Sequence, residues 1–292
     1  MAYLCRLLVV ICLGVLGCQD CVAETFQNMV VVQSQAVGYA ITAKKSGGES
    51  IYKNPACFEG SDVWRIETTY ASFFDHLYQA AGFSASGSID GVGDVALTIP
   101  VKMVDGIPET IAGPGKAVQL STFSDIQTAA ILSWSGQLSS NLRLGVNSAG
   151  YFHRIGREQA TGIGIDIGAL YTEGPINLGF SVQNLGGLKL TWPNDVSTFE
   201  EIVNFGVGYT FSDLAIYLDT ATAGPFKDEL NLGGEFNLSP QCQLLSGIQG
   251  LGTQNQVSFG ISLFLDAMTV HYAFSQLSDL GSIQKIGLGV DL

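Results

Sequence analysis

Three histidines are the residues best suited to acid–base or metal chemistry in this chain of 292 residues. His76 and His153 fall at the ends of segments with alternating apolar residues, and only His271 lies inside such a segment. No serine stands at a spacing that would make it a nucleophile for His271, and no second metal ligand accompanies it. We therefore expect no catalytic site, no metal site and no cofactor, and we interpret His271 as a structural or lumen-lining side chain.

The first 23 residues have the three parts of a signal peptide. Arg6 supplies the positive charge, an apolar core follows, and Cys21-Val22-Ala23 is a small-residue cleavage site. An alternative is a lipoprotein box that ends at Cys18, which would then carry a lipid. Either signal predicts an exported protein.

Cleavage after Ala23 would leave two cysteines, Cys57 and Cys242. Export places them in an oxidising compartment, where they could form one disulfide. The sequence alone does not show whether the two sulfurs lie within bonding distance, so two unpaired thiols are the alternative.

The composition excludes one large class of partner. A net charge of -13 opposes binding to nucleic acid, whose phosphates require a basic surface. Only 13% of the residues are charged, 47% are hydrophobic and 36 are glycine, which suits strands and turns better than helices. After the signal, no apolar run is long enough for a membrane-spanning helix.

The remaining chain shows a repeated alternation with a period of two residues, which is the pattern of β-strands. Between residues 202 and 211, for example, Phe205, Val207 and Tyr209 alternate with small or polar residues. The segments that follow this rule are 62–73, 76–86, 91–103, 118–134, 140–152, 160–171, 175–184, 202–211, 213–221, 230–238, 243–250, 256–264, 267–274 and 283–292.

The connections between these segments alternate between long and short. Long ones are expected at 104–117, 185–201 and 222–229, whereas 172–174 and 212–213 are tight. Outer-membrane barrels have short turns on the periplasmic side and long loops outside. The pattern therefore predicts an all-β, transmembrane antiparallel barrel of about 14 strands over residues 61–292. A soluble β-sandwich is the alternative, because its strands alternate as well.

Residues 24–60 precede the first strand and contain Asn54-Pro55-Ala56 after a segment with several glycines. This stretch resembles the hatch that plugs the barrel of FadL-type long-chain fatty-acid transporters and of the related PorV/PorQ-like outer-membrane families. Residues 181–187 and 272–281 are similar to the PorV-type families, and a set of spirochaetal paralogues resembles the chain over nearly its whole length. Barrels of this kind usually end on Phe or Trp, whereas this chain ends on Leu292.

The resemblance implies that a cation meets the ligand carboxylate inside the barrel. Arg65 and Arg143 are the candidates on the inward-facing positions, with Lys285 a weaker one. An ion pair with Glu67 is the alternative role for Arg65. For Arg143, the alternatives are that it holds the plug in place or that it contacts a carboxylate such as Asp166.

Pro100 interrupts an otherwise regular strand, and a closed barrel has no edge at which a proline fits without distortion. In FadL-type barrels a kinked early strand opens sideways into the membrane, so Pro100 is the candidate for a lateral opening. A bulge at the rim with no passage is the alternative.

Two functions follow from the resemblance. The first is a monomer in the outer membrane that is surrounded by lipid and passively admits hydrophobic molecules such as long-chain fatty acids. The second is a scaffold that transports nothing and binds protein partners through its loops.

Overall fold

The computed structural model describes residues 30–112, 117–221, 229–252, 255–277 and 281–292. The expected signal peptide (residues 1–23), Cys18 and residues 222–228 of the expected loop 222–229 lie outside the described residues. No helix in the described part of the chain is long and apolar enough to cross a membrane.

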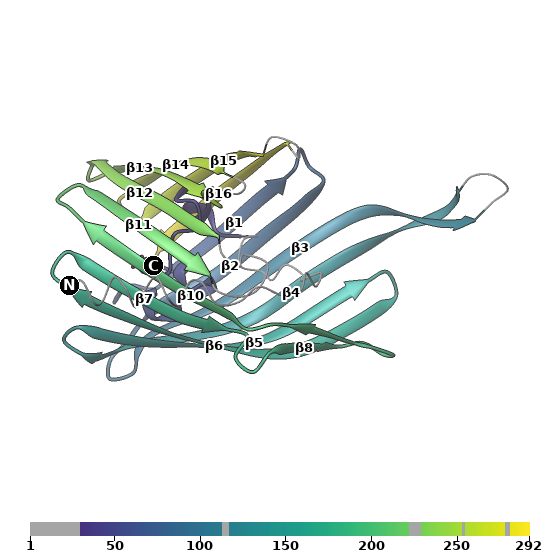
Figure 1. Cartoon of the computed structure of the whole chain (residues 1–292), viewed down its shortest axis with the longest axis horizontal. Helices are drawn as coiled ribbons and strands as arrows, with labels where there is room; N and C mark the ends of the chain where they lie inside the picture. Colours follow the sequence, from purple (N-terminus) through teal and green to yellow (C-terminus); the bar gives the residue numbers. More distant parts are fainter. Residues whose placement is uncertain (1–29, 113–116, 222–228, 253–254, 278–280) are drawn as a thin grey trace.

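Fourteen strands of the described chain form one closed antiparallel barrel (Figure 1). Each strand pairs with its neighbour along the chain, and β1 pairs with β16 to close the ring. The predicted all-β barrel is confirmed. Its strands are β1 (Arg65–Phe73), β2 (Tyr78–Ile89), β3 (Gly93–Ala112), β4 (Ala117–Ser139), β5 (Leu142–Ile155), β6 (Glu158–Glu173), β7 (Ile176–Gln183), β10 (Ile202–Thr210), β11 (Leu214–Ala221), β12 (Leu230–Ser239), β13 (Cys242–Gln249), β14 (Gln256–Leu265), β15 (Met268–Leu277) and β16 (Gly281–Asp291).

The alternation in the sequence separates the two faces of the wall. In β10, Phe205 and Val207 are exposed on the outside, while Asn204 between β7 and β11 is 1% exposed on the inside. The same division holds in the other strands, so the outer face is a continuous apolar surface and the inner face is small or polar.

The prediction of a loop at 104–117 is wrong, because the described residues of this stretch belong to strands. β3 and β4 continue as a two-stranded arm that projects beyond the barrel in Figure 1. Register shifts between Val104 and Ile107 and between Glu109 and Thr110 accommodate Gly106 and Pro108 within the pairing. The expected loop 185–201 contains a short hairpin, β8 (Leu188–Thr191) and β9 (Val196–Phe199), which pairs with β6 through Thr161 and Thr191.

Residues 30–60, here called the amino-terminal segment, lie inside the barrel (Figure 1). The segment contains the helix α2 (Val32–Ala36) and the 3-10 helices η2 (Ser50–Tyr52) and η3 (Pro55–Cys57). α2 contacts β13 to β16, and η3 contacts β4, β5 and β6 on another part of the wall. The segment therefore spans the lumen and buries the polar inner face of the strands.

Candidate functional site

Asp219 of β11 is the strongest anchor of the amino-terminal segment. Its Oδ2 accepts hydrogen bonds from the backbone N–H groups of Ile41 and Thr42 and from the Thr42 hydroxyl, each at 2.8 Å. The Lys53 ammonium lies 3.0 Å from the same oxygen. Asp219 is 1% exposed, so one buried carboxylate satisfies four donors of the segment.

Two further pairs of charged and polar groups join the segment to the wall. Lys44 lies 3.0 Å from Glu235 of β12. Lys285 of β16 donates to the Val31 carbonyl at 3.2 Å and to the Tyr39 hydroxyl at 3.1 Å. The buried charges on the wall thus face partners on the segment.

Glycines on the inner wall let the segment lie close to the strands. A Cβ at Gly179 would overlap the backbone of Thr42, and a Cβ at Gly247 would overlap the backbone of Val37. The contact between segment and wall therefore depends on missing side chains as well as on charges.

Arg143 holds the segment and does not face an open lumen. Its Nη2 donates to Asp94 Oδ2 at 2.6 Å and to the Phe58 carbonyl at 2.8 Å, and its Nε donates to the Ala56 carbonyl at 3.4 Å. Asp166, the other carboxylate considered for this arginine, accepts a hydrogen bond from Asn147 at 3.0 Å.

Arg65 is paired within the wall. Its Nε lies 3.0 Å from Glu67 Oε1 and its Nη1 lies 2.9 Å from Asp291 Oδ1. Both arginines that the sequence offered for a ligand carboxylate thus have protein carboxylates as partners.

Asn54, Pro55 and Ala56 lie against the wall at β6. The Asn54 amide donates to the carbonyl of Thr42 at 2.7 Å and to that of Ala169 at 3.2 Å, and its oxygen accepts from the Ala56 N–H at 3.0 Å. Pro55 begins the 3-10 helix η3. The three residues therefore form a buried turn inside the barrel, several residues before β1 begins.

The disulfide considered between Cys57 and Cys242 is not formed in the structure, where both thiols are free. Cys57 is fully buried, and its Sγ contacts the Thr42 carbonyl at 3.1 Å. Burial raises the pKa of the Cys57 thiol. Cys242 begins β13 opposite Leu263, away from that contact.

The two sides of the segment differ in chemistry. β1 and β3 run in the same direction, so Phe73 at the end of β1 lies toward the arm. There, Phe73 stacks on Tyr78 with ring centroids 4.4 Å apart, within an apolar cluster that includes Ile283.

At the opposite end, a cavity of about 390 Å³ is lined mainly by charged and polar residues. It includes Lys45 and Glu59, which form an ion pair at 3.1 Å, and Arg65 with its partners. On the arm side of the segment the lumen thus carries an aromatic cluster with Lys102 beside it, whereas the other side is mainly charged and polar.

The pairing of β3 with β4 is interrupted at Pro100. The ladder joins Thr98 to Ile131 and Val101 to Thr128, but Ile99 and Pro100 have no ladder partners on β4. The Thr128 hydroxyl donates to the Pro100 carbonyl at 2.9 Å. Proline has no N–H to donate to β4, so the Thr128 hydroxyl supplies a bond across this seam, while β2 still pairs with Ile99 and Pro100 on the other side.

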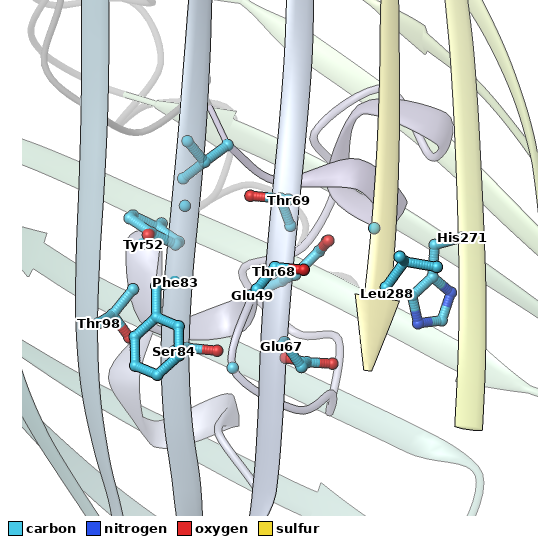
Figure 2. A pocket seen from close by; sticks show the side chains of 14 residues that line it. Glu49, Tyr52, Glu67, Thr68, Thr69, Phe83, Ser84, Thr98, His271 and Leu288 are labelled. Carbon is cyan, nitrogen blue, oxygen red and sulfur yellow. The ribbon is translucent and has the colours of Figure 1, made fainter. Parts of the chain in front are cut away.

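A cavity of about 30 Å³ lies between the segment and the wall, mainly against β1, β2 and β16 (Figure 2). Gly82, the partner of Pro100 on β2, lines it together with Tyr52 and Thr98. Phe83 and Leu288, whose side chains are exposed on the outer face, line it too. Thr68 of β1 pairs with Phe83 on one side and with Leu288 on the other, so the wall is an intact single sheet at these residues.

No protein-family model and no curated protein sequence matches this chain. Among solved structures, the monoaromatic hydrocarbon channel CymD superimposes with a TM-score of 0.68 at 12% identity, over 92% of this chain and 99% of that one. The toluene transporter TodX of Pseudomonas putida gives a TM-score of 0.60 at 13% identity, over 92% and 98% of the two chains. A FadL homologue of Pseudomonas aeruginosa gives 0.54 at 9% identity, over 92% and 99%.

The chain has the fold of these proteins. The likeness extends over most of both chains in each case, so it concerns the whole barrel and not a shared substructure.

Asp219 and Lys53 were not among the site residues predicted from the sequence. Asp219 is the only charged residue on the inward-facing positions of β11, where its neighbours are Ala215, Tyr217 and Ala221. A buried carboxylate is costly unless it is paired, so its presence there indicates a partner inside the barrel. That isolated inward charge was the available signal.

Proposed function

We propose that this protein is an outer-membrane barrel that passively admits hydrophobic molecules, long-chain fatty acids among them, and releases them sideways into the membrane. The continuous apolar outer face supports a position in lipid, because a water-soluble protein rarely exposes so large a patch. The likeness in fold to hydrocarbon channels supports hydrophobic substrates.

Residues 24–60 act as the hatch in this proposal, after a signal peptide at 1–23 has been removed. The described part of the hatch spans the lumen and is fixed by Asp219, Glu235 and Lys285. Arg65 and Arg143 already have protein carboxylates as partners, so a fatty-acid carboxylate would compete with Glu67, Asp291 and Asp94 for them.

The polarity of the lumen favours a lateral route. A ligand would enter from the arm end and bind at the apolar cluster around Phe73 and Tyr78. Passing on into the charged cavity would cost about 25 cal/mol for each Å² of apolar surface returned to water. Leaving through the wall keeps the apolar chain out of water.

The single observation that carries the proposal is the interrupted ladder between β3 and β4 at Ile99 and Pro100. The two strands would part more readily there than where the ladder pairs are complete. An opening there would connect the lumen directly with lipid.

The test is uptake of a labelled fatty acid by cells that make the Pro100→Val protein. Valine restores a backbone donor, so we expect uptake to fall by about tenfold while barrel stability holds or rises. Pro108→Val is the matched control, because Pro108 is an exposed proline of the same strand in the projecting arm. Unchanged uptake in a folded Pro100→Val barrel would refute the lateral exit at this position.

A second function, that of a scaffold, is favoured by the arm. Ile111, Val118 and Leu120 are exposed there, beyond the part of the wall where β3 and β4 have other neighbours. Extraction of lipid from the purified barrel separates the two functions. Bound fatty acid supports transport, whereas a lipid-free barrel that binds a defined surface protein through the arm supports the scaffold.

A further inference from the structure

We propose that Arg154 and Arg157 bind the phosphate of a lipid head group in the membrane leaflet on the arm side of the barrel. This inference rests on the proposed position of the barrel in a membrane, and it is independent of any transport. It assigns a lipid-binding site to the outer face of β5, outside the lumen.

Arg154 faces the lipid side of the wall. In the same strand, Asn147 donates to the Ile51 carbonyl of the amino-terminal segment at 2.7 Å and is therefore inward, whereas Val146 is exposed on the outer face. Side chains alternate between the two faces of a strand, and the ladder of β5 with β6 has no register shift. Arg154, eight residues after Val146, therefore points outward.

Arg154 is the only basic residue that faces outward from the barrel strands of the described chain. The others face the lumen, where each meets the segment, a carboxylate or an aromatic ring: Arg65, Lys102, Arg143 and Lys285. A basic side chain on the lipid face is costly at the middle of a membrane and almost without cost near its surface. Arg154 therefore marks the level at which lipid head groups begin.

The outward residues of β6 change from apolar to polar at the same level. Ile165 and Ile163 are exposed on the outer face, and toward the arm end they are followed by Thr161 and Gln159. Gln159 is the ladder partner of Arg154. An apolar row that ends in polar residues is expected where hydrocarbon gives way to head groups.

Neither arginine has an anionic partner within the described part of the chain. Arg157 stands in the exposed turn between β5 and β6, and neither guanidinium group forms an ion pair or a hydrogen bond with another described residue. The chain has 26 acidic and only 13 basic residues, so carboxylates are not scarce. Two unpaired arginines close together in so acidic a protein indicate an anion from outside the chain.

A phosphate is the anion that a membrane offers at this level. The planar guanidinium group binds phosphate oxygens through two parallel hydrogen bonds. Three residues span at most about 11 Å of chain, so the positive charge of Arg157 adds to that of Arg154. Charge complementarity therefore favours a lipid with a net negative head group over a zwitterionic one.

The outer surface next to Arg154 suits an acyl chain. Gly150 lies four residues from Arg154 in the same outward row, and a Cβ added there would meet no heavy atom of a non-neighbouring residue within 4 Å. Its ladder partners are Ala130 of β4 and Ile163 of β6, and Ile163 is 77% exposed. A lipid whose phosphate meets Arg154 can lay its chain over Gly150 and beside Ile163, which removes apolar surface from water.

The test places the full barrel in phosphatidylcholine nanodiscs that contain a minor share of phosphatidylglycerol, and counts the retained lipids by native mass spectrometry. Phosphatidylglycerol has a net negative head group, whereas the choline cation balances the phosphate of phosphatidylcholine. We expect the unmodified protein to enrich phosphatidylglycerol about tenfold over its share in the nanodisc. Arg154→Gln combined with Arg157→Gln should remove the enrichment.

Three controls separate a lipid site from general charge and from a loss of structure. Lys189→Gln removes one positive charge from an exposed position of β8, whose neighbours Leu188 and Leu190 pack against Ala160, and it should keep the enrichment. Gly150→Leu should lower retention of both lipids and keep their ratio. For the unmodified protein, sodium chloride at about 0.5 M should lower the enrichment by at least about threefold.

Equal retention of both lipids by the unmodified protein would overturn the proposal, as would full enrichment in a folded double variant. Glycerol 3-phosphate has a phosphate without acyl chains, and its displacement of phosphatidylglycerol at equal concentration would overturn the assignment to a lipid. A barrel that does not insert into nanodiscs would instead count against the proposed function, and so the two failures are distinguishable.

Discussion

Replacement of Asp219 by asparagine should loosen the amino-terminal segment without unfolding the barrel. The side chain keeps its size and one acceptor oxygen but loses the charge that receives three hydrogen bonds of 2.8 Å and pairs with Lys53. Hydrogen bonds to a charged group are worth about 1 kcal/mol more than neutral ones, so three of them amount to about 3 kcal/mol. The docked fraction of the segment should then fall by about a hundredfold relative to the free one.

Hydrogen exchange measures this directly at the backbone N–H groups of Ile41 and Thr42, which Asp219 holds. Both should exchange about a hundredfold faster in Asp219→Asn, and the conductance of the barrel in a planar bilayer should rise. Asp213→Asn is the control, since Asp213 lies in the exposed turn between β10 and β11 and does not contact the segment. Unchanged exchange at Ile41 and Thr42 in a folded Asp219→Asn barrel would refute the anchoring role.

Two further predictions concern the contact between the segment and the wall. Cys57 should resist maleimide in the folded protein, because the residue is buried and the pKa of its thiol is raised. The partly exposed Cys242 should react. Rapid labelling of both cysteines, detected by mass spectrometry, would contradict this packing. Gly247→Ala should weaken docking by about 1–3 kcal/mol, because the new Cβ overlaps the backbone of Val37, whereas Gly150→Ala, at an open position, should not. Equal hydrogen exchange of the segment in these two variants would refute the close-approach argument.

The barrel could be predicted from the sequence because each strand carries its own signal. Phe205, Val207 and Tyr209 alternate with small or polar residues, and the wall places them on opposite faces. The arm could not be predicted, because Gly106 and Pro108 normally end a strand. Cross-strand pairing with register shifts accommodates both residues, and such pairing is a property of two strands together.

The contacts of the amino-terminal segment were beyond the reach of the sequence for a different reason. Asp219 stands 178 residues from Ile41, and nothing local indicates that the two meet. The same holds for Arg143, whose contact with the Phe58 carbonyl depends on how the segment crosses the lumen. Inward-facing positions could be identified from alternation, but the partners of those positions could not.

A disulfide across the interruption between β3 and β4 tests the proposed lateral exit most directly. Ile99→Cys with Ala130→Cys would join β3 to β4 on the outer face where the register leaves them opposite but unpaired, and Leu97→Cys with Leu132→Cys would join them where the ladder is intact. The two pairs lie two residues apart on each strand, so both face the same side of the wall. Native Cys57 and Cys242 would be replaced by alanine in both variants. We expect oxidation of the first pair to reduce uptake of labelled palmitate by about tenfold, reversibly with a reductant, and oxidation of the second to change it by less than about twofold. Undiminished uptake with the first pair fully oxidised would contradict a lateral exit at this site.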